Sequence, residues 1–442
     1  MLSPARSAAF DILLRVERQA AYASELLHAE RYRKLSSPDH ALCTELVMGV
    51  LRWRSALDEA VQRAASQPLR KMDLEVLIAL RLGAYQMGWL ERVPARAAIF
   101  ESVELVKRVR KRSAAGFVNA LLRKLASQAA GLRPQAPADQ SVRGLSQAYA
   151  HPEWLVARWI EQFGADAAAR ICAHDQQIPA TVIRLRSPAA EQELMAAGIE
   201  LAPGAFLSDV RRVTKGDVTR AAVFREGRIA IQDEASQLVA ALVGQGRRLL
   251  DCCAAPGGKT AILADRNPGA VVIAAELHPQ RARLLRRLVA AQNVRVIAAD
   301  AIHLPIAGEF DRALADVPCS GTGTLARNPE IKWRLHPEDL ADLHARQVAI
   351  ARSALERLSP GGRLVYSTCS LEPEENQAVV EELLATGRNF RLLDCREELR
   401  AMQKRGELVW QDLDSMTSGE FLRTLPGVHP CDGFFAAIFE KR

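Results

Sequence analysis

The sequence has little of what marks membrane, secreted or metal-binding proteins. No apolar run approaches the roughly 20 residues that span a bilayer. The stretch MLSPARSAAFDILLRV carries Arg6, Asp11 and Arg15 where a signal peptide would be apolar. The eight cysteines form no C-x-x-C pair and the nine histidines no H-E-x-x-H motif, so a zinc site or disulfide framework at the usual spacing is not expected. We therefore expect a cytoplasmic protein that binds neither a metal nor a membrane.

Positive charge is concentrated near the start of the chain. The net charge is +7; residues 1–140 hold 22 Lys and Arg against 14 Asp and Glu, whereas the remainder holds 37 against 38. The densest run is KRVRKR, residues 107–112. Such a cluster is either a solvated helix face or a patch that binds nucleic-acid phosphates, and the sequence leaves both interpretations open.

The pattern of apolar residues divides the chain into domains, as expected for 442 residues. Residues 4–127 place apolar residues at i, i+3/i+4 and i+7 almost throughout, which predicts an all-α domain over 1–130. A stretch with Gly, Pro and Gln then predicts a linker over 131–147. Two helical patterns and the strand PATVIRLRS follow, and they indicate a small α+β module over 148–228.

From residue 229 to residue 442, apolar strands alternate with helices. GRRLLDCCA, AVVIAAEL, VRVIAAD, FDRALADVP and RLVYSTC have the pattern of buried strands, and GKTAILADR and PQRARLLRRLVAAQ that of helices. This alternation predicts an α/β domain with a doubly wound, Rossmann-like parallel sheet. Such sheets bind their ligands at the carboxyl ends of the strands.

A glycine-rich turn after the first of these strands indicates a ligand site. In DCCAAPGGKT (251–260), the turn and the helix that follows can present backbone N–H groups to a polar ligand. Cys253 stands where a Walker A loop has its first glycine, and there is no G-x-G-x-x-G for a dinucleotide. Glu276 and Asp300 end the next two strands, where carboxylates can bind a ribose and an adenine. A nucleoside held without a pyrophosphate cradle indicates S-adenosylmethionine. The residues expected to hold it are Cys253, Ala254, Ala255, Pro256, Gly257, Gly258, Lys259, Glu276, Asp300 and Asp316.

Two cysteines also stand at strand ends. Cys319 follows the strand FDRALADV in the stretch DVPCSGTGTLARNPEIKW (316–333), and Cys369 follows RLVYST. Most free thiols are small buried hydrophobic groups, but the placement of these two at the ligand-binding edge favours a chemical role. Arg327 and Lys332, in the tail of the first motif, are either phosphate contacts or part of a solvated loop.

Taken together, these motifs resemble those of the RNA (cytosine-5)-methyltransferase family, in particular its bacterial RsmB (Sun/Fmu) branch. The matching stretches are QDEASQLVA (232–240), DCCAAPGGKT, DVPCSGTGTLARNPEIKW, YSTCSLEPEEN (366–376) and DGFF (432–435). LRLGAYQMGWLERVPARAA and GFVNALLRKL resemble the NusB-like N-terminal domain of that branch, so the resemblance covers nearly the entire chain. Glu276 departs from the Asp that the family usually has, and 278–294 lacks the usual Asn-Leu-x-x-Leu-Gly ending.

The resemblance implies a monomeric enzyme that methylates C5 of a cytosine in 16S rRNA with S-adenosylmethionine. It assigns the attack on C6 of the base to Cys369 and the release of product to Cys319, whereas spacing alone leaves these roles undecided. The covalent attack would make the poorly nucleophilic C5 reactive. Asp316 is expected between cofactor and base, and the base must leave its stack to enter. The NusB-like domain and the small module are expected to bind RNA.

Other functions stay open on the sequence. The same chemistry could act on tRNA or on another rRNA position, or the chain could be a non-catalytic RNA-binding factor with a vestigial catalytic domain. A DNA cytosine methyltransferase would use a Pro-Cys cysteine as nucleophile and would need neither Cys369 nor a helical RNA-binding domain. A thiol redox enzyme is disfavoured because C-x-x-C spacing is absent. The target nucleotide is not identified by the sequence.

Overall fold

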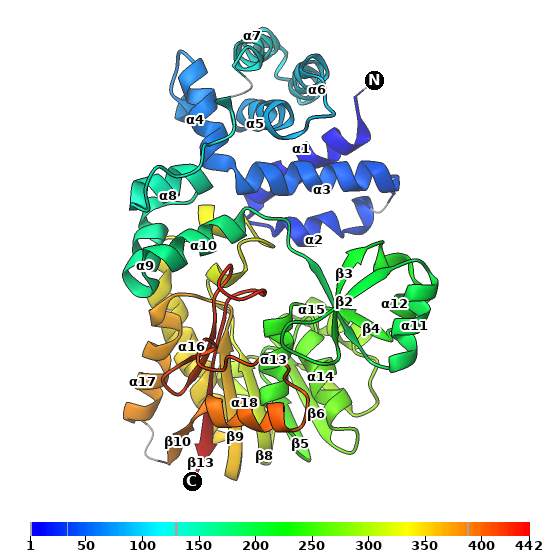
Figure 1. Cartoon of the computed structure of the whole chain (residues 1–442), viewed down its shortest axis with the longest axis vertical. Helices are drawn as coiled ribbons and strands as arrows, with labels where there is room; N and C mark the ends of the chain where they lie inside the picture. Colours follow the sequence, from blue (N-terminus) through cyan, green and yellow to red (C-terminus); the bar gives the residue numbers. More distant parts are fainter. Residues whose placement is uncertain (1, 33, 129–130, 387–388) are drawn as a thin grey trace. The chain divides into compact units, whose positions relative to one another are not determined.

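The structure is a computed structural model that describes residues 2–32, 34–128, 131–386 and 389–442. Its chain forms two compact units. The first, called here the helical unit, contains the residues up to Ile178 together with Leu325–Arg334. The second, called the sheet unit, contains Pro179–Thr324 and Leu335–Arg442. Figure 1 shows the elements of each unit with their labels.

The described residues of the helical unit form helices alone. Gly49 in one helix allows the ring of Tyr85 to pack against it, because a Cβ at Gly49 would lie 2.0 Å from that ring. The Tyr85 hydroxyl then donates to Glu45 at 2.6 Å, so the buried phenol has a partner. The helices are α1 (Pro4–Gln19), α2 (Ala23–Leu27), η1 (Glu30–Tyr32), α3 (Ser37–Arg52), α4 (Arg54–Ala64), η2 (Leu69–Lys71), α5 (Leu74–Trp89), α6 (Ala95–Arg108), η3 (Arg112–Ala114), α7 (Ala115–Ala126), α8 (Val142–Tyr149), α9 (Glu153–Phe163), α10 (Ala165–Asp175) and η8 (Ile331–Trp333).

The middle of the chain is divided differently from the expected linker (131–147) and module (148–228). The linker range already contains the start of α8, and α8 to α10 belong to the helical unit. Buried hydrogen bonds hold them there: His151 pairs with Asp175 at 3.2 Å, and the Gln176 amide donates to the Arg52 carbonyl of α3 at 3.3 Å. The sheet of the expected module belongs to the sheet unit instead. Residues 129 and 130, at the end of the expected helical domain, lie outside the described residues.

Leu325–Arg334, called here the inserted segment, packs into the helical unit although it forms the tail of the motif that contains Cys319. The segment satisfies backbone groups there: the Trp333 indole donates to the Leu51 carbonyl at 2.6 Å, and the Arg334 guanidinium donates to the carbonyls of Val16, Ala20 and Ala21. Arg52 in turn donates to the Ala326 carbonyl at 3.0 Å. The segment is therefore a structural part of the helical unit.

Lys332 lies inside this packing rather than in solvent. Lys332 is 1% exposed, and its Nζ has no hydrogen-bond partner among the residues that the structure describes. Burial lowers the pKa of Lys332 to about 7, although nearby Asp175 acts in the opposite direction. A side chain in this position does not reach a phosphate or the solvent, so both interpretations made from the sequence are wrong for Lys332.

The sheet unit begins with a small antiparallel sheet. Its strand order is β2-β3-β1-β4, and one face packs against α11 and α12 through buried residues such as Ile183, Leu194 and Val223. Its elements are β1 (Thr181–Leu185), α11 (Pro188–Ala196), β2 (Glu200–Pro203), β3 (Val210–Lys215), η5 (Val218–Arg220), α12 (Ala222–Arg225) and β4 (Ile229–Ile231).

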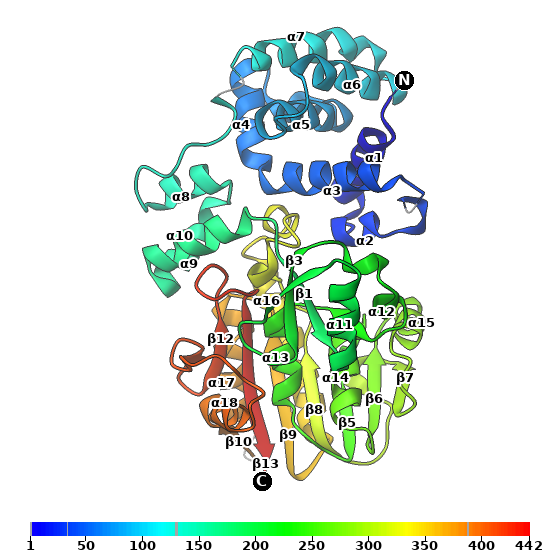
Figure 2. The ribbon, with the colours of Figure 1, turned by 45° about the vertical axis from the view of Figure 1, so that its right-hand side comes forward.

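The central sheet of the sheet unit has nine strands within the described residues, in the order β11-β12-β13-β9-β8-β5-β6-β7 with β10 beside β13. The neighbouring strands β9, β8, β5, β6 and β7 pair in parallel, which confirms the predicted parallel α/β sheet for its core (Figure 2). At the C-terminal side the sheet is mixed, because β13 pairs antiparallel with β9, β10 and β12, and β11 pairs antiparallel with β12. Its elements are α13 (Glu234–Leu242), β5 (Arg248–Asp251), α14 (Gly258–Arg266), β6 (Val271–Glu276), α15 (Pro279–Leu288), β7 (Val294–Ala298), η6 (Ala301–His303), β8 (Phe310–Asp316), η7 (Thr322–Thr324), α16 (Asp339–Glu356), β9 (Leu358–Thr368), η9 (Pro373–Glu375), α17 (Gln377–Thr386), β10 (Phe390–Leu393), α18 (Cys395–Lys404), β11 (Thr417–Ser418), β12 (Phe421–Thr424) and β13 (Phe434–Lys441).

Helices cover both faces of this sheet. Alternate residues of each strand point to opposite faces, so Leu249 and Leu314 pack with α13, α14 and α18, whereas Leu250 and Ala313 pack with α16 and α17. No helix in the described part of the chain is long and apolar enough to cross a membrane. The carboxyl ends of β5, β6, β8 and β9 all meet at one edge, where the loops that follow them gather.

Candidate active site

Two thiols meet at this edge of the sheet. Cys319 follows β8, Cys369 follows β9, and because these strands are parallel neighbours their loops start side by side. The two sulfur atoms lie 3.3 Å apart, within hydrogen-bonding distance, and neither cysteine is fully buried. The hydrogen bond with Cys369, followed by burial, raises the pKa of Cys319 well above its usual value. The structure therefore brings together the two cysteines that the sequence singled out.

A buried carboxylate joins the two cysteine loops. Glu375 is fully buried, and its Oε1 accepts from the Ser320 N–H at 2.8 Å and from the Gln347 amide at 2.8 Å. Its Oε2 accepts from the hydroxyls of Ser320 and Ser370, the residues directly after Cys319 and Cys369. A single carboxylate thus bonds the neighbours of both thiols, which fixes the loops relative to each other. Nothing in the sequence distinguishes Glu375 from the other two acids of LEPEEN (371–376).

The backbones of these loops also touch. The Gly323 N–H donates to the Cys369 carbonyl at 2.9 Å, and the Gly433 N–H donates to the Gly323 carbonyl at 2.7 Å. A Cβ at Gly323 would lie 2.3 Å from the Gly433 oxygen, so this approach requires glycine. The DGFF motif therefore supports the loop that carries Cys319.

A cationic side chain lies beside the thiols. The Lys259 ammonium, at the start of α14, forms an ion pair with Asp316 at 2.8 Å and lies 5.1 Å from the centre of the Phe434 ring. Burial lowers the pKa of Lys259, but the negative charges of Asp316, Cys369 and Asp251 outweigh it, and the pKa is raised overall. Lys259 therefore stays charged at neutral pH. Asp316 also accepts from the Ser367 hydroxyl at 2.8 Å, which orients its carboxylate.

A cavity of about 200 Å³ opens next to this ion pair. Two of its buried polar atoms have no partner within the described residues, Asp251 Oδ1 and Gln232 Oε1. Burial raises the pKa of Asp251 to about 7 even though Thr260 donates to its other oxygen at 2.7 Å. The lining residues are Ile231, Gln232, Ser236, Asp251, Cys253, Ala254, Ala255, Pro256, Gly258, Lys259 and Asp316.

The donors and acceptors of this cavity fit part of an S-adenosylmethionine molecule. Two acceptor oxygens without donors suit its amino group, and the turn before α14 offers backbone N–H groups to its carboxylate. Gly257, at φ +118°, lies against Leu285 and Val289, and a Cβ there would come within 2.7 Å of both side chains. The turn therefore keeps its shape only with glycine at this position. Asp251, Gln232 and Ser236 belong to motifs noticed in the sequence, but they were not chosen as site residues.

Three expected cofactor residues do not line this cavity: Gly257, which shapes the turn, and the carboxylates Glu276 and Asp300. Glu276 ends β6, is 5% exposed, and accepts from the His278 N–H at 2.9 Å. Asp300 follows β7 and accepts from the Ile302 N–H at 2.9 Å, which caps the short helix η6. The bond to Glu276 uses Oε1 alone, and the second oxygen of Asp300, Oδ2, lies 3.8 Å from His303 Nδ1. Among the described residues, no group of His, Cys, Asp and Glu side chains could hold a metal ion.

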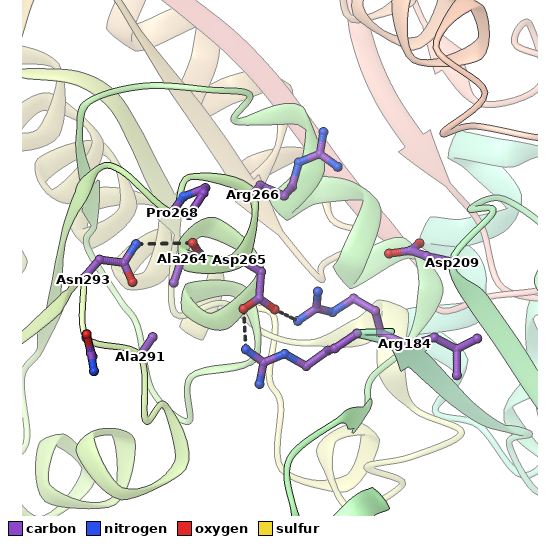
Figure 3. A pocket seen from close by; sticks show the side chains of 11 residues that line it. Arg184, Asp209, Ala264, Asp265, Arg266, Pro268, Ala291 and Asn293 are labelled. Carbon is purple, nitrogen blue, oxygen red and sulfur yellow. Dashed lines mark hydrogen bonds and ion pairs between the residues drawn. The ribbon is translucent and has the colours of Figure 1, made fainter. Parts of the chain in front are cut away.

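A larger cavity, of about 620 Å³, lies at the opposite end of α14 (Figure 3). Its central carboxylate, Asp265, accepts from Arg184 at 2.6 Å and from Arg186. Asn293 donates to the Ala264 carbonyl at 3.3 Å. Because α14 begins at the thiol edge and ends here, this cavity is separate from the paired cysteines. Its charged groups mostly pair with one another.

The KRVRKR cluster of the helical unit is largely ion-paired. Lys107 pairs with Glu104 at 2.7 Å, Arg108 with Asp11 at 2.5 Å and Lys111 with Asp73 at 2.8 Å. Glu104 lies on the same helix as Lys107, whereas Asp11 and Asp73 come from distant parts of the sequence, so the sequence did not reveal these two partners. The cluster therefore presents less free positive charge than its composition indicates.

Comparisons with known proteins agree with this arrangement. The family model "16S rRNA methyltransferase RsmB/F" matches residues 240–440, and the NusB family model matches residues 3–127. The chain is 34% identical to the "Probable ribosomal RNA small subunit methyltransferase B" of Bacillus subtilis, over 99% of this chain and 98% of that protein. The crystal structure of PH0851 shares the fold with a TM-score of 0.80, at 21% identity, covering 99% of this chain and 98% of that one. NSun6 from Pyrococcus horikoshii, whose structure title names the ligand SFG, has a TM-score of 0.56 at 18% identity, covering 66% of this chain and 98% of that one.

Proposed function

This chain belongs to the ribosomal RNA small subunit methyltransferase B family of S-adenosylmethionine-dependent 16S rRNA methyltransferases, and on that premise we propose that it methylates C5 of a cytosine through a covalent cysteine adduct. The observation that carries the proposal is the pair of thiols 3.3 Å apart, at the strand ends beside the turn that lines the 200 Å³ cavity. A methyltransferase acting on a base nitrogen or oxygen needs no thiol pair. Methylation at cytosine C5 needs one thiol as nucleophile, because C5 becomes nucleophilic only after a thiolate adds to C6, and a second thiol beside it can accept the C5 proton.

S-adenosylmethionine, when bound, supplies an electrophilic methyl group. The 253–259 loop, with Asp316, would hold it, and Glu276 and Asp300 at the next strand ends would hold its ribose and adenine. Gln232 and Asp251 have free acceptor oxygens toward the same cavity. The SFG named with the Pyrococcus structure is an analogue of this cofactor, which supports the assignment.

Cys369 is the proposed nucleophile. The Lys259 ammonium lies near enough for a negative charge on Cys369 to raise the pKa of Lys259, so a positive charge is available beside this thiol. The Cys369 thiolate adds to C6, and C5 becomes the carbon that takes the methyl group. Asp316, held by Lys259 and Ser367, is positioned to accept a hydrogen bond from the cytosine amino group.

Cys319 is the proposed proton acceptor for the second half of the reaction. After methylation C5 carries both a methyl group and its original hydrogen, which must leave as a proton before the Cys369 sulfur can depart from C6. Cys319 Sγ lies 3.3 Å from Cys369 Sγ, so a base bonded to Cys369 would place C5 near it. Cys319 would take the C5 proton in its thiolate form, as a general base.

The two thiols can be separated by trapping. Cys369→Ala is expected to be inactive and to form no link to RNA, whereas Cys319→Ala is expected to methylate once and remain attached, giving a slow protein–RNA band on denaturing gels. Cys395→Ala, a buried thiol of the same unit, serves as the control and is expected to turn over normally. Adduct in Cys369→Ala and none in Cys319→Ala would reverse the assignment. If both Cys369→Ala and Cys319→Ala methylated the RNA without forming an adduct, the reaction would not proceed through a covalent cysteine adduct.

The substrate is tested by mapping the modified base. Bisulfite sequencing of 16S rRNA and tRNA from a deletion strain is expected to show one 5-methylcytosine lost from 16S rRNA and restored by the wild-type gene. Loss from tRNA alone would keep the chemistry and change the substrate. No loss from either RNA, together with no methyl transfer to unmodified 16S rRNA in vitro, would contradict the proposed function.

A further inference from the structure

Helix α15 carries a concentration of positive charge that the catalytic site does not use. Between Glu276 and Asp300 the sequence contains five arginines and no acidic residue. Four of the five, Arg281, Arg283, Arg286 and Arg287, lie on α15, and all of them are exposed. The balance of 37 basic and 38 acidic residues over the last two thirds of the chain conceals this local excess.

The arginines point away from the sheet because the helix buries its other face. Ala282, Leu285 and Val289, at i, i+3 and i+7, are the buried residues of α15 and its C-terminal end, and Leu285 and Val289 pack with Ala274 of β6. Gln280, Arg283, Arg286 and Arg287 line an open hollow of about 530 Å³ on the outer side. Three guanidinium groups and one amide thus converge there without a carboxylate.

These guanidinium groups are not neutralised within the sheet unit. Arg281 has its nearest carboxylate, Glu276, at 4.0 Å, and within the described residues no carboxylate oxygen lies within 4 Å of Arg283, Arg286 or Arg287. The Arg286 guanidinium makes one long contact, 3.5 Å, with the Val296 carbonyl. The KRVRKR cluster differs in this respect, since Lys107, Arg108 and Lys111 each have an acidic partner.

We infer that the outer face of α15 binds the phosphate backbone of the RNA substrate. The inference rests on the proposed function, which supplies an RNA that must reach the thiol edge. The helix starts three residues after Glu276, at that same edge, and Arg281 to Arg287 cover about 9 Å along its axis. Unpaired arginines in an open hollow match phosphate oxygens in charge and geometry. The face therefore guides the RNA strand that flanks the target cytosine.

The salt dependence of RNA binding tests this surface. The probe is unmodified 16S rRNA made by transcription in vitro, and the variant replaces Arg283, Arg286 and Arg287 by Ala. Losing three phosphate contacts is expected to make the slope of log K, the association constant, against log salt less negative by about 2. The Kd at 0.1 M salt is expected to rise at least about tenfold. The corresponding triple Lys variant keeps the charge and is expected to keep most of the slope.

A second triple variant controls for net charge. Arg391, Arg400 and Arg405 are also exposed and lie in the same unit, but each is paired with a glutamate, so their replacement by Ala removes the same charge without removing an unpaired cluster. Its slope is expected to stay near that of the wild type. Affinity for S-adenosylmethionine, expected to be unchanged in every variant, checks that each one is folded.

The outcomes separate the surface from the function. The inference about α15 would be wrong if the two Ala variants changed the salt slope and the Kd equally. It would also be wrong if the α15 variant changed neither while the wild type still bound and methylated the transcript. Both outcomes are compatible with the proposed function. If the α15 Ala variant lost the binding of the wild type to phosphatidylglycerol vesicles but kept its rRNA binding, the ligand of this face would be a lipid surface and the inference would be wrong. A wild-type protein that neither binds nor methylates the transcript would overturn the proposed function and the surface together.

Discussion

Replacing Lys332 by Met is expected to stabilise the helical unit, most strongly at neutral and acidic pH. Lys332 is 1% exposed, its Nζ has no hydrogen-bond partner within the described part of the chain, and burial lowers its pKa from 10.5 to about 7. A lysine in the unfolded chain keeps a pKa near 10.4. The folded protein therefore favours the neutral amine, and below about pH 7 it must hold a charge that the unfolded chain hydrates freely.

The size and pH window of the effect follow from this difference. At about 1.4 kcal/mol per pKa unit, the shift from 10.5 to about 7 corresponds to an upper value of about 5 kcal/mol. Between pH 7 and 10.5 the unfolded chain binds more protons than the folded one, so the stability of the wild type rises with pH in this window. The penalty is complete below pH 7 and is relieved above 10.5. Methionine cannot be charged and fills a similar volume, so the gain should be largest near pH 6.5 and should shrink toward pH 10.

The assay is denaturant unfolding of wild type and Lys332→Met at pH 6.5, 8 and 9.5, followed by tryptophan fluorescence. Only the difference between the two proteins is interpreted, because other groups titrate equally in both. Lys34→Met, at an exposed position of the same unit, is the matched control and should show no pH-dependent difference. A Lys332→Met protein that is destabilised by the same amount at every pH, or whose gain grows with pH, would refute the reasoning.

Three further changes test the site and the RNA surfaces. Glu276→Ala is expected to weaken S-adenosylmethionine binding at least about tenfold, the roughly 1.4 kcal/mol of a lost charge-assisted hydrogen bond, and unchanged calorimetric affinity would contradict its role. Glu375→Gln replaces one acceptor oxygen by an amide that faces the Ser320 and Ser370 hydroxyls, so kcat should fall at least about tenfold while cofactor affinity is kept; equal loss of both would indicate general misfolding instead. Neutralising Lys107, Arg108, Arg110 and Lys111 together should reduce the salt slope of RNA binding by less than the α15 variant does, because three of the four are ion-paired; a reduction approaching 4 would favour the helical unit as the main phosphate contact.

The sequence predicted the sheet and the meeting of the thiols because both depend on local pattern and chain order. GKTAILADR is helical from Gly258 to Arg266, and the strands that carry Asp316 and Cys369 are neighbours in the parallel core. Parallel strands have their carboxyl ends at one edge of the sheet, so the sequence alone predicts that residues distant in the chain lie close together there.

The features that the sequence did not predict depend on partners far along the chain. Lys332 stands in a basic, polar stretch that has the composition of a solvated loop, and its burial comes from helices more than 150 residues earlier. The partners of Lys111 and Arg108 are likewise set by tertiary packing. Glu375 is one of three closely spaced acids, and only the positions of Ser320 and Ser370 distinguish it.

The inserted segment has a consequence for how the protein is made. Ile178 leaves the ribosome 147 residues before Leu325, and at about 5–20 residues per second this interval lasts roughly 7–30 s. During that time the helical unit lacks the groups that bond the carbonyls of Leu51, Val16 and Ala21. Its folding is therefore completed only after much of the sheet unit has been synthesised. A gene fragment that stops at residue 178 therefore encodes a helical unit that lacks the inserted segment. A fragment that begins at residue 179 encodes the inserted segment without the helices against which it packs.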